Sequence, residues 1–132
     1  MRISGTFLDE ITHDIPSNNW GREEWARDFR IMRAIGIDTV IMIRAGCGRI
    51  ATYDSAVLRH HVDIYPVYSD LVTMFLDLAE EYGLDFYFGT YDSVSYATRE
   101  RSVQEHLDLG KTFIEEAWER YGQRTAFKGW YL

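Results

Sequence analysis

The fold is decided by residues 36–43, Gly-Ile-Asp-Thr-Val-Ile-Met-Ile, and by the similar residues 83–89, Gly-Leu-Asp-Phe-Tyr-Phe-Gly. Each stretch has a glycine that can end a helix, then an apolar residue, then an aspartate that opens a strand. Residues 37–43 contain too few polar residues to alternate, which is typical of a strand buried on both faces of a sheet. The repeated junction therefore predicts two successive helix-to-strand units, with a central strand at 37–43.

Helical periodicity fills the stretches between the predicted strands. Three helices are expected, and they end at Gly36, Gly83 and Gly122. The first begins at Gly21, where Glu24 can reach back to the free amides of the first turn. The apolar stripes in chain order are Trp25, Phe29 and Met32; Leu71, Phe75, Leu78 and Tyr82; and Val103, Leu107, Ile114, Trp118 and Tyr121.

Apolar runs at 3–8 and 126–132 add a strand at each end of this pattern. Alternating strands and helices imply parallel strands with right-handed connections, so we expect an α/β fold of order β-α-β-α-β-α-β. The 132 residues suffice for a single domain over 1–132. They are too few for a complete (β/α)8 barrel, which needs about 200–250 residues.

Composition excludes several kinds of partner. The chain has 21 acidic and 14 basic residues and a net charge of -7, so no nucleic-acid partner is expected. Its single cysteine, Cys47, cannot form an internal disulfide, and no Cys/His cluster has zinc spacing, so no metal and no cofactor are expected. Neither a signal peptide nor a membrane span is evident. The chain as written is expected to be cytoplasmic, or secreted or periplasmic if the native N-terminus differs.

In a parallel α/β sheet, ligands bind at the carboxyl ends of the strands, which places a site just after Leu8, Ile43, Gly89 and Leu132. After the first strand come Asp9 and Glu10, with Thr12, His13 and Asp14 behind them. These groups can bind sugar hydroxyls, hold a cation or act as an acid/base pair. A solvated loop, or one hydrogen-bonded to the next helix, is the structural alternative.

Arg44 follows the second strand and can pair with a carboxylate of the first loop, hold an anionic ligand or form a purely structural ion pair. Residues 44–69 show no clear helical or strand period, and so long a loop is functional or disordered in most domains. It holds Tyr53, His60, His61, Asp63, Tyr65 and Tyr68. Adjacent histidines point in different directions on a regular element, so His60 and His61 make a poor metal pair.

Residues 46–51, Gly-Cys-Gly-Arg-Ile-Ala, match the G-x-G-x-x-G/A fingerprint of dinucleotide-binding proteins. That fingerprint must open a helix and be followed about 20 residues later by an acidic residue at the end of a strand. Residues 52–55 show no helical stripe, and Asp70 falls at the start of a helix. A dinucleotide site is therefore not expected, and Cys47 is a passive loop thiol.

Tyr91 and Asp92 follow the third strand, with Thr90, Ser93 and Tyr96 nearby. A carboxylate beside tyrosines suits a sugar, whose hydroxyls form hydrogen bonds and whose apolar C–H face packs on aromatic rings. Packing of these tyrosines on helix ends is the structural alternative.

Four segments together resemble one known family: GTFLDEITHDIPSNNW (5–20), EEWARDFRIMRAIGIDTVIMIRAG (23–46), YPVYSDLVTMFLDLAEEYGLDFYFGTYDS (65–93) and ERYGQRTAFKGWYL (119–132). It is the bacterial domain-of-unknown-function family of glycoside-hydrolase-like TIM barrels. The resemblance implies that the chain is the first half of a (β/α)8 barrel, strands one to four, with a carbohydrate ligand. The family's members continue after strand four with an acidic pair, and related barrel glycosidases carry their acid/base glutamate after strand four and their nucleophile after strand seven. Both positions would lie beyond Leu132.

The resemblance assigns substrate positioning to five residues of the first three loops: Asp9, Glu10, Arg44, Tyr91 and Asp92.

Three interpretations of the function remain. The first is a truncated piece of a carbohydrate-active barrel hydrolase that is inactive alone. The second is a non-catalytic half-barrel binding or assembly module, a homo-oligomer that covers its open sheet edges. The third is a small flavodoxin-like domain for a phosphorylated ligand, although the first turn, FLDEIT, lacks a Gly/Ser-rich anion cradle.

Overall fold

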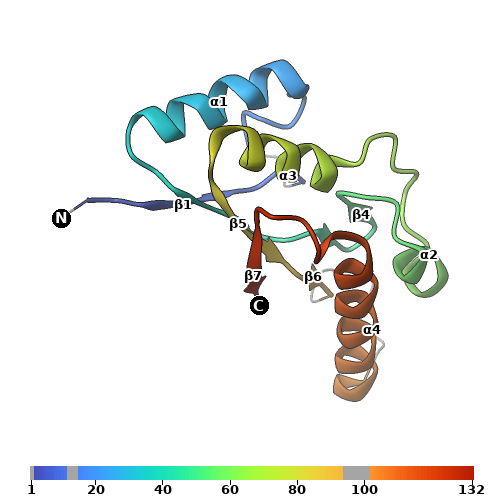
Figure 1. Cartoon of the computed structure of the whole chain (residues 1–132). Helices are drawn as coiled ribbons and strands as arrows, with labels where there is room; N and C mark the ends of the chain where they lie inside the picture. The colour runs from blue at the N-terminus through green and yellow to red at the C-terminus, as the bar shows by residue number, and fades with distance from the viewer. Residues whose placement is uncertain (1, 12–14, 94–101) are drawn as a thin grey trace.

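Four parallel strands form the main sheet of the computed structural model, which describes residues 2–11, 15–93 and 102–132 (Figure 1). They lie in the order β1 (Gly5–Leu8), β2 (Thr39–Met42), β5 (Asp85–Gly89) and β7 (Phe127–Tyr131). Each neighbouring pair is parallel. The predicted α/β order with four parallel strands is therefore confirmed, and spatial order follows chain order without a reversal.

Helices α1 (Arg22–Ala34), α3 (Leu71–Tyr82) and α4 (Val103–Tyr121) connect these strands. The predicted start of α1 is confirmed, because the Gly21 N–H donates to Glu24 Oε2 at 2.9 Å. Gly36 and Gly83 follow the ends of α1 and α3, and their φ angles are +96° and +67°. Residues with a side chain rarely adopt such positive φ angles. Helices α1 and α3 lie side by side, as Figure 1 shows.

The apolar stripe predicted for α4 is wrong except for Tyr121. Val103, Leu107 and Trp118 are exposed, and Ile114 is only partly buried. The buried stripe consists of Leu109, Phe113, Ala117 and Tyr121. Neighbouring residues on a helix differ by about 100° in direction, so a stripe chosen one position away faces a different side. The burial of Ala117 could not be recognised from the sequence, because alanine is common on both the buried and the exposed face of a helix.

The segment predicted to lack regular structure, residues 44–69, is partly ordered, which corrects that expectation. It contains the short strands β3 (Gly46–Cys47) and β4 (Ile50–Ala51) and the helix α2 (Ala56–Val62). With β6 (Tyr91–Asp92), the two strands form a second sheet of order β4-β3-β6. The fingerprint residues 46–51 thus form a hairpin instead of opening a helix. Seven helical residues with one buried side chain, Leu58, are too few to produce a visible period.

The two faces of the main sheet differ in what covers them. On one face the register aligns Phe7 with Ile41, Ile41 with Tyr87, and Tyr87 with Gly129. These side chains keep partial exposure, and that of Phe7 is 53% exposed. The opposite face packs under the helices, and its fully buried residues are Val40, Met42, Phe86 and Phe88. Among the described residues, helices therefore cover one face only.

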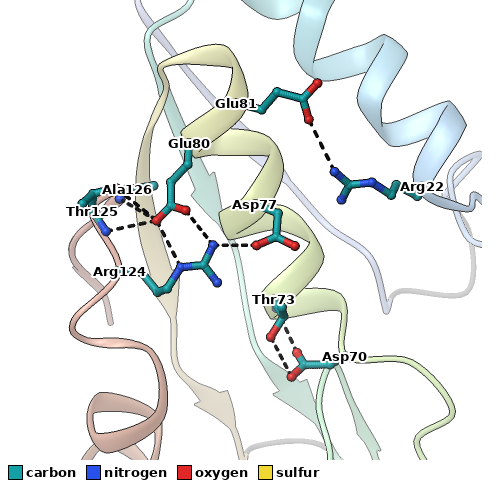
Figure 2. Close-up of polar contacts among 9 residues, drawn as sticks. All are labelled: Arg22, Asp70, Thr73, Asp77, Glu80, Glu81, Arg124, Thr125 and Ala126. Carbon is teal, nitrogen blue, oxygen red and sulfur yellow. Dashed lines mark hydrogen bonds and ion pairs between the residues drawn. The ribbon is translucent and has the colours of Figure 1, made fainter.

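A charged cluster fastens the turn before β7 to α3 (Figure 2). Arg124 Nη2 lies 2.6 Å from Asp77 Oδ1 and 2.7 Å from Glu80 Oε2. Glu80 Oε1 also accepts a hydrogen bond from the Thr125 N–H at 3.0 Å. The cluster lies at the amino-terminal ends of the strands, where it sets the position of β7 beside β5.

Candidate functional site

An open depression lies at the carboxyl ends of β2, β5 and β7, the edge at which the sequence predicts a site. Its volume is about 320 Å³. Its lining residues are Ile43, Arg44, Thr90, Tyr91, Asp92, Tyr131 and Leu132. Three of the four strands of the main sheet thus deliver residues to one place.

Two of the residues that line this depression form an ion pair between segments far apart in sequence, since Arg44 follows β2 and Asp92 lies on β6. Arg44 Nη1 donates to Asp92 Oδ2 at 3.1 Å, and both side chains are partly buried. Arg44 Nη1 also lies 3.7 Å from Cys47 Sγ. Burial by itself would lower the pKa of Arg44, but the contact with Cys47 and the charges of Asp9 and Asp92 raise it above its ordinary value. Arg44 is therefore a permanent cation that pairs with Asp92 and also interacts with the charge of Asp9 in the first loop.

The loop after β1 places its two carboxyl groups in different environments. Asp9 Oδ1 accepts a hydrogen bond from the Ile11 N–H at 3.2 Å. Glu10 is only 6% exposed, and its Oε2 has no hydrogen-bond partner among the described residues. Burial, and secondly the charge of Asp9, raises the pKa of Glu10 to about 8. Glu10 therefore holds its proton near neutral pH and can donate a hydrogen bond, which an ordinary carboxylate cannot.

Tyr91 reaches the depression, but its hydroxyl is directed elsewhere. It is 8% exposed, and its hydroxyl donates to the Gly48 carbonyl at 2.8 Å. Tyr91 thereby holds the β3–β4 hairpin in place beside Arg44 and Asp92. Its role as a sugar-contacting ring stays a prediction that the packing does not favour. Thr12, His13, Asp14 and Tyr96 lie outside the described residues.

Sequence reasoning missed Tyr131, a residue of the last strand that lines the depression. Its ring lies edge-on to Phe7, with the centroids 5.2 Å apart. The signal that could have identified it is its place at the carboxyl end of a predicted strand. Tyr53, considered with the loop aromatics, is instead fully buried in the core.

The other polar residues of the 44–69 segment do not join the depression. His60 and His61 lie on α2, with their rings 4.8 Å apart and nearly perpendicular. Tyr65 lies under the guanidinium of Arg49, and Tyr68 is exposed. In residues 2–11, 15–93 and 102–132, no three His, Cys, Asp or Glu side chains are grouped so that they can hold a metal ion. None of the helices in these ranges is long and apolar enough to cross a membrane.

The depression can recognise a ligand rich in hydroxyl groups. Arg44 supplies donors, Asp92 supplies acceptors, and the Tyr131 ring supplies a partly exposed apolar surface beside them. Ligand sites of this kind combine a few polar groups with aromatic walls.

Comparison with protein families gives one match for nearly the whole chain. The model described as "Domain of unknown function (DUF4434)" matches residues 3–132. A comparison with curated proteins gave no significant match.

Several solved structures are similar to the chain, and two of them are described here. One is a protein from Bacteroides thetaiotaomicron VPI-5482 called a "putative alpha-L-fucosidase", with 49% identity and a TM-score of 0.86 over 99% of this chain. The chain spans only 40% of the length of that protein. The other is a beta-galactosidase from the psychrophilic Marinomonas ef1, with 16% identity and a TM-score of 0.58, of which this chain covers 21%. The second similarity concerns the fold alone.

Proposed function

This chain belongs to the DUF4434 family of domains of unknown function, and we propose that it is the substrate-positioning part of a glycoside-hydrolase-like (β/α)8 barrel. The observation that carries the proposal is the Arg44–Asp92 pair, which joins the segments that follow β2 and β5 at the carboxyl edge of a parallel sheet. In barrels of this type the loops at that edge carry the site.

The strand order supports the half barrel. The four main strands follow one another in space as they do in the chain, and they are all parallel. A flavodoxin-like sheet has the order 2-1-3-4-5 and helices on both faces, so the order found here argues against that alternative. Right-handed crossovers that always step in the same direction keep the helices on one face, as in a barrel wall.

A carbohydrate is the ligand class that best fits the depression. A sugar offers adjacent hydroxyls, to which an Arg–Asp pair can donate and accept at the same time. Its C–H face can pack on the partly exposed ring of Tyr131. Glu10, protonated near neutral pH, is a further hydrogen-bond donor, at the end of β1. The name of the Bacteroides relative makes L-fucose the first sugar to test.

Positioning, and not bond cleavage, is the role proposed for Asp9, Glu10, Arg44 and Asp92. The acid/base and nucleophile carboxylates of such a barrel are expected after strands four and seven, beyond Leu132. The relative's chain is longer than this one, which is consistent with catalytic groups contributed by segments outside the sequence described here. The chain alone should therefore bind a sugar without hydrolysing glycosides.

Calorimetric titration with L-fucose, D-galactose and D-glucose tests this function. Weak binding of at least one sugar by the wild type is expected, and Asp92→Asn and Arg44→Gln should each weaken it about tenfold or more. Arg22→Gln is the matched control, because it removes an exposed ion pair with Glu81 on α1 and α3, away from the depression.

Three results would overturn the proposal. They are binding of a nucleotide or inorganic phosphate but of no sugar, sugar binding that Asp92→Asn leaves unchanged, and turnover of nitrophenyl glycosides by the chain alone. The last would refute the purely positioning role and leave the ligand class intact.

A further inference from the structure

The β3–β4 hairpin, residues 46–51, is held between the two segments that carry the ion pair of the candidate site. Arg44 precedes β3 by two residues, and Asp92 lies opposite Cys47 in the parallel β3–β6 pair. The Gly48 N–H donates to the Asp92 carbonyl at 3.3 Å. A movement of the hairpin therefore shifts the backbone of Arg44 relative to that of Asp92.

Tyr91 fixes the tip of this hairpin. Its ring lies directly against Gly46, where an added Cβ would be 2.9 Å from Tyr91 Cδ2. Its hydroxyl donates to the Gly48 carbonyl at 2.8 Å, and the side chain is buried. Because a buried hydroxyl that loses its partner is costly, this contact favours one position of the hairpin.

Thr52 fixes the base of the same hairpin. It is fully buried, and its hydroxyl and its N–H both donate to the Ala45 carbonyl, each at 2.8 Å. Its own carbonyl accepts from the Leu71 N–H at 2.9 Å, at the start of α3. Since Ala45 directly follows Arg44, these contacts restrain the backbone from which the Arg44 side chain extends.

Cys47 connects the hairpin to the ion pair itself. Its Sγ lies 3.7 Å from Arg44 Nη1 and 4.0 Å from Asp92 Oδ2, while these two groups are 3.1 Å apart. A thiol is a weak donor and a weak acceptor, so these contacts contribute little energy. Cys47 is the only cysteine of the chain, however, and its reactivity reports where the hairpin stands relative to Arg44.

We infer that the β3–β4 hairpin positions Arg44 against Asp92, and that Tyr91 and Thr52 are positioning residues that act through it. A long side chain that is held in one orientation before the ligand arrives loses less entropy on binding. Tyr91 thus serves the site through its contact with the hairpin, and not through a contact between its hydroxyl and the ligand. The inference deepens the proposed function and rests on it for the sugar ligand.

Alkylation of Cys47 by iodoacetamide, at one pH and without sugar, tests the position of Arg44. A guanidinium beside a thiol favours the reactive thiolate, so Arg44→Gln should slow the reaction at least about threefold. Tyr91→Phe removes only the hydroxyl that holds the hairpin. In that background Arg44→Gln should slow the reaction less than about 1.5-fold, because Arg44 is no longer held beside Cys47. Tyr68→Phe, at a residue that is 96% exposed, is the matched control and should leave the effect of Arg44→Gln unchanged.

Calorimetric titration with L-fucose, D-galactose and D-glucose measures the consequence for binding. Tyr91→Phe and Thr52→Val should each weaken the binding of any sugar that the wild type binds by about three- to tenfold. Thr52→Ser keeps the hydroxyl and should restore an affinity close to that of the wild type. Tyr68→Phe should bind as tightly as the wild type.

An effect of Arg44→Gln on alkylation that is absent from the wild type, or equal in the wild-type and Tyr91→Phe backgrounds, overturns the inference. So does a sugar affinity that Tyr91→Phe and Thr52→Val leave unchanged. If the wild type binds no sugar, the proposed function fails, whereas the alkylation rates still decide whether the hairpin positions Arg44. Far-UV circular dichroism checks the fold of each variant, and Thr52→Val repeats the alkylation test from the base of the hairpin if Tyr91→Phe does not fold.

Discussion

Arg124 Nη2 lies 2.7 Å from Glu80 Oε2, so an ion pair ties the turn before β7 to the last turns of α3 (Figure 2). The hydrogen bonds from Arg124 outweigh the effect of burial and lower the pKa of Glu80 from 4.5 to about 2. The ionised form of Glu80 thus stabilises the position of the fourth strand of the main sheet.

We predict that this contact makes the fold sensitive to acid. Because the pKa of Glu80 is lower in the folded than in the unfolded chain, its contribution is complete above pH 4.5 and is lost as the pH falls toward 2. Glu80→Gln should reduce the free energy of unfolding by about 1–2 kcal/mol at neutral pH and flatten this acid dependence. Urea denaturation at several pH values measures both the free energy of unfolding and its dependence on pH. Glu81→Gln, which breaks the exposed pair with Arg22, should cost less than about 0.5 kcal/mol, and an equal cost would contradict the prediction.

The end of β5 should not tolerate a side chain at Gly89. A Cβ atom there would lie 2.2 Å from the Met42 carbonyl oxygen and 2.6 Å from the Arg44 nitrogen, so the β2 backbone would have to move. Gly89→Ala is expected to lower the free energy of unfolding by about 1–3 kcal/mol and to weaken ligand binding, because the shift reaches Arg44. Gly110→Ala on α4, where a Cβ meets nothing within 4 Å, should instead stabilise the chain by about 0.5–1 kcal/mol. Thermal denaturation of both variants distinguishes steric conflict from a general effect of alanine.

Buried Glu10 should make the chain less stable as the pH rises. Its pKa is about 8 in the folded chain against 4.5 in the unfolded chain, so stability is greatest below pH 4.5 and falls as the pH rises to 8. Glu10→Gln removes the charge with little change of shape, and above pH 8 it should be more stable than the wild type by about 1–3 kcal/mol. Stability curves against pH test this, with Glu23→Gln on the exposed first turn of α1 as the matched control. A slope that persists in Glu10→Gln would show that another group causes it.

Glu116 should be necessary for α2. Its Oε1 accepts hydrogen bonds from the Ala56 and Val57 N–H groups at 2.8 and 3.2 Å, which satisfies the free amides at the start of the helix. Its Oε2 accepts from the hydroxyls of Ser55 and Tyr53. Glu116→Gln should cost about 1–2 kcal/mol, because the amide group cannot accept at every contact.

Hydrogen exchange should show the loss of Glu116 as faster exchange of the α2 amides. Glu115→Gln, at the exposed neighbouring position, should leave their exchange unchanged. Equal protection in both variants would mean that Ser55 alone caps α2, through its contact with the Leu58 N–H.

Local signals in the sequence were sufficient to predict most strands of the main sheet and the helices that connect them. The start of α1 was predictable, because Glu24 is three residues from the Gly21 amide that it binds. The ends of α1 and α3 were predictable, because a glycine at a left-handed position follows from backbone sterics alone. Helix α2 was not predicted, because its seven residues bury a single side chain, and the carboxylate that binds its first amides, Glu116, lies 60 residues from Ala56.

Part of the candidate site was predictable for a similar reason. The predicted strand ends at 8, 43 and 89 place Asp9, Arg44 and Asp92 at one edge of the sheet. Tyr91 follows the strand that ends at Gly89, but its hydroxyl donates to the Gly48 carbonyl. No residue near Tyr91 in the sequence indicates that contact. Tyr131 was placed in the last predicted strand but given no role, because its position beside Phe7 depends on how β1 and β7 are arranged in space.

The sequence by itself determined which residues form the four main strands, their parallel order and the edge at which polar residues collect, since these depend on periodicity, glycines and caps within a few residues. Only the tertiary structure decided that Arg44 pairs with Asp92, 48 residues away, that Glu10 is buried, and that Phe7 meets Tyr131 across a curled sheet. The physical reason is that these contacts depend on strand register and sheet curvature. Both are set by how the helices pack on one face, and neither is encoded in any single segment.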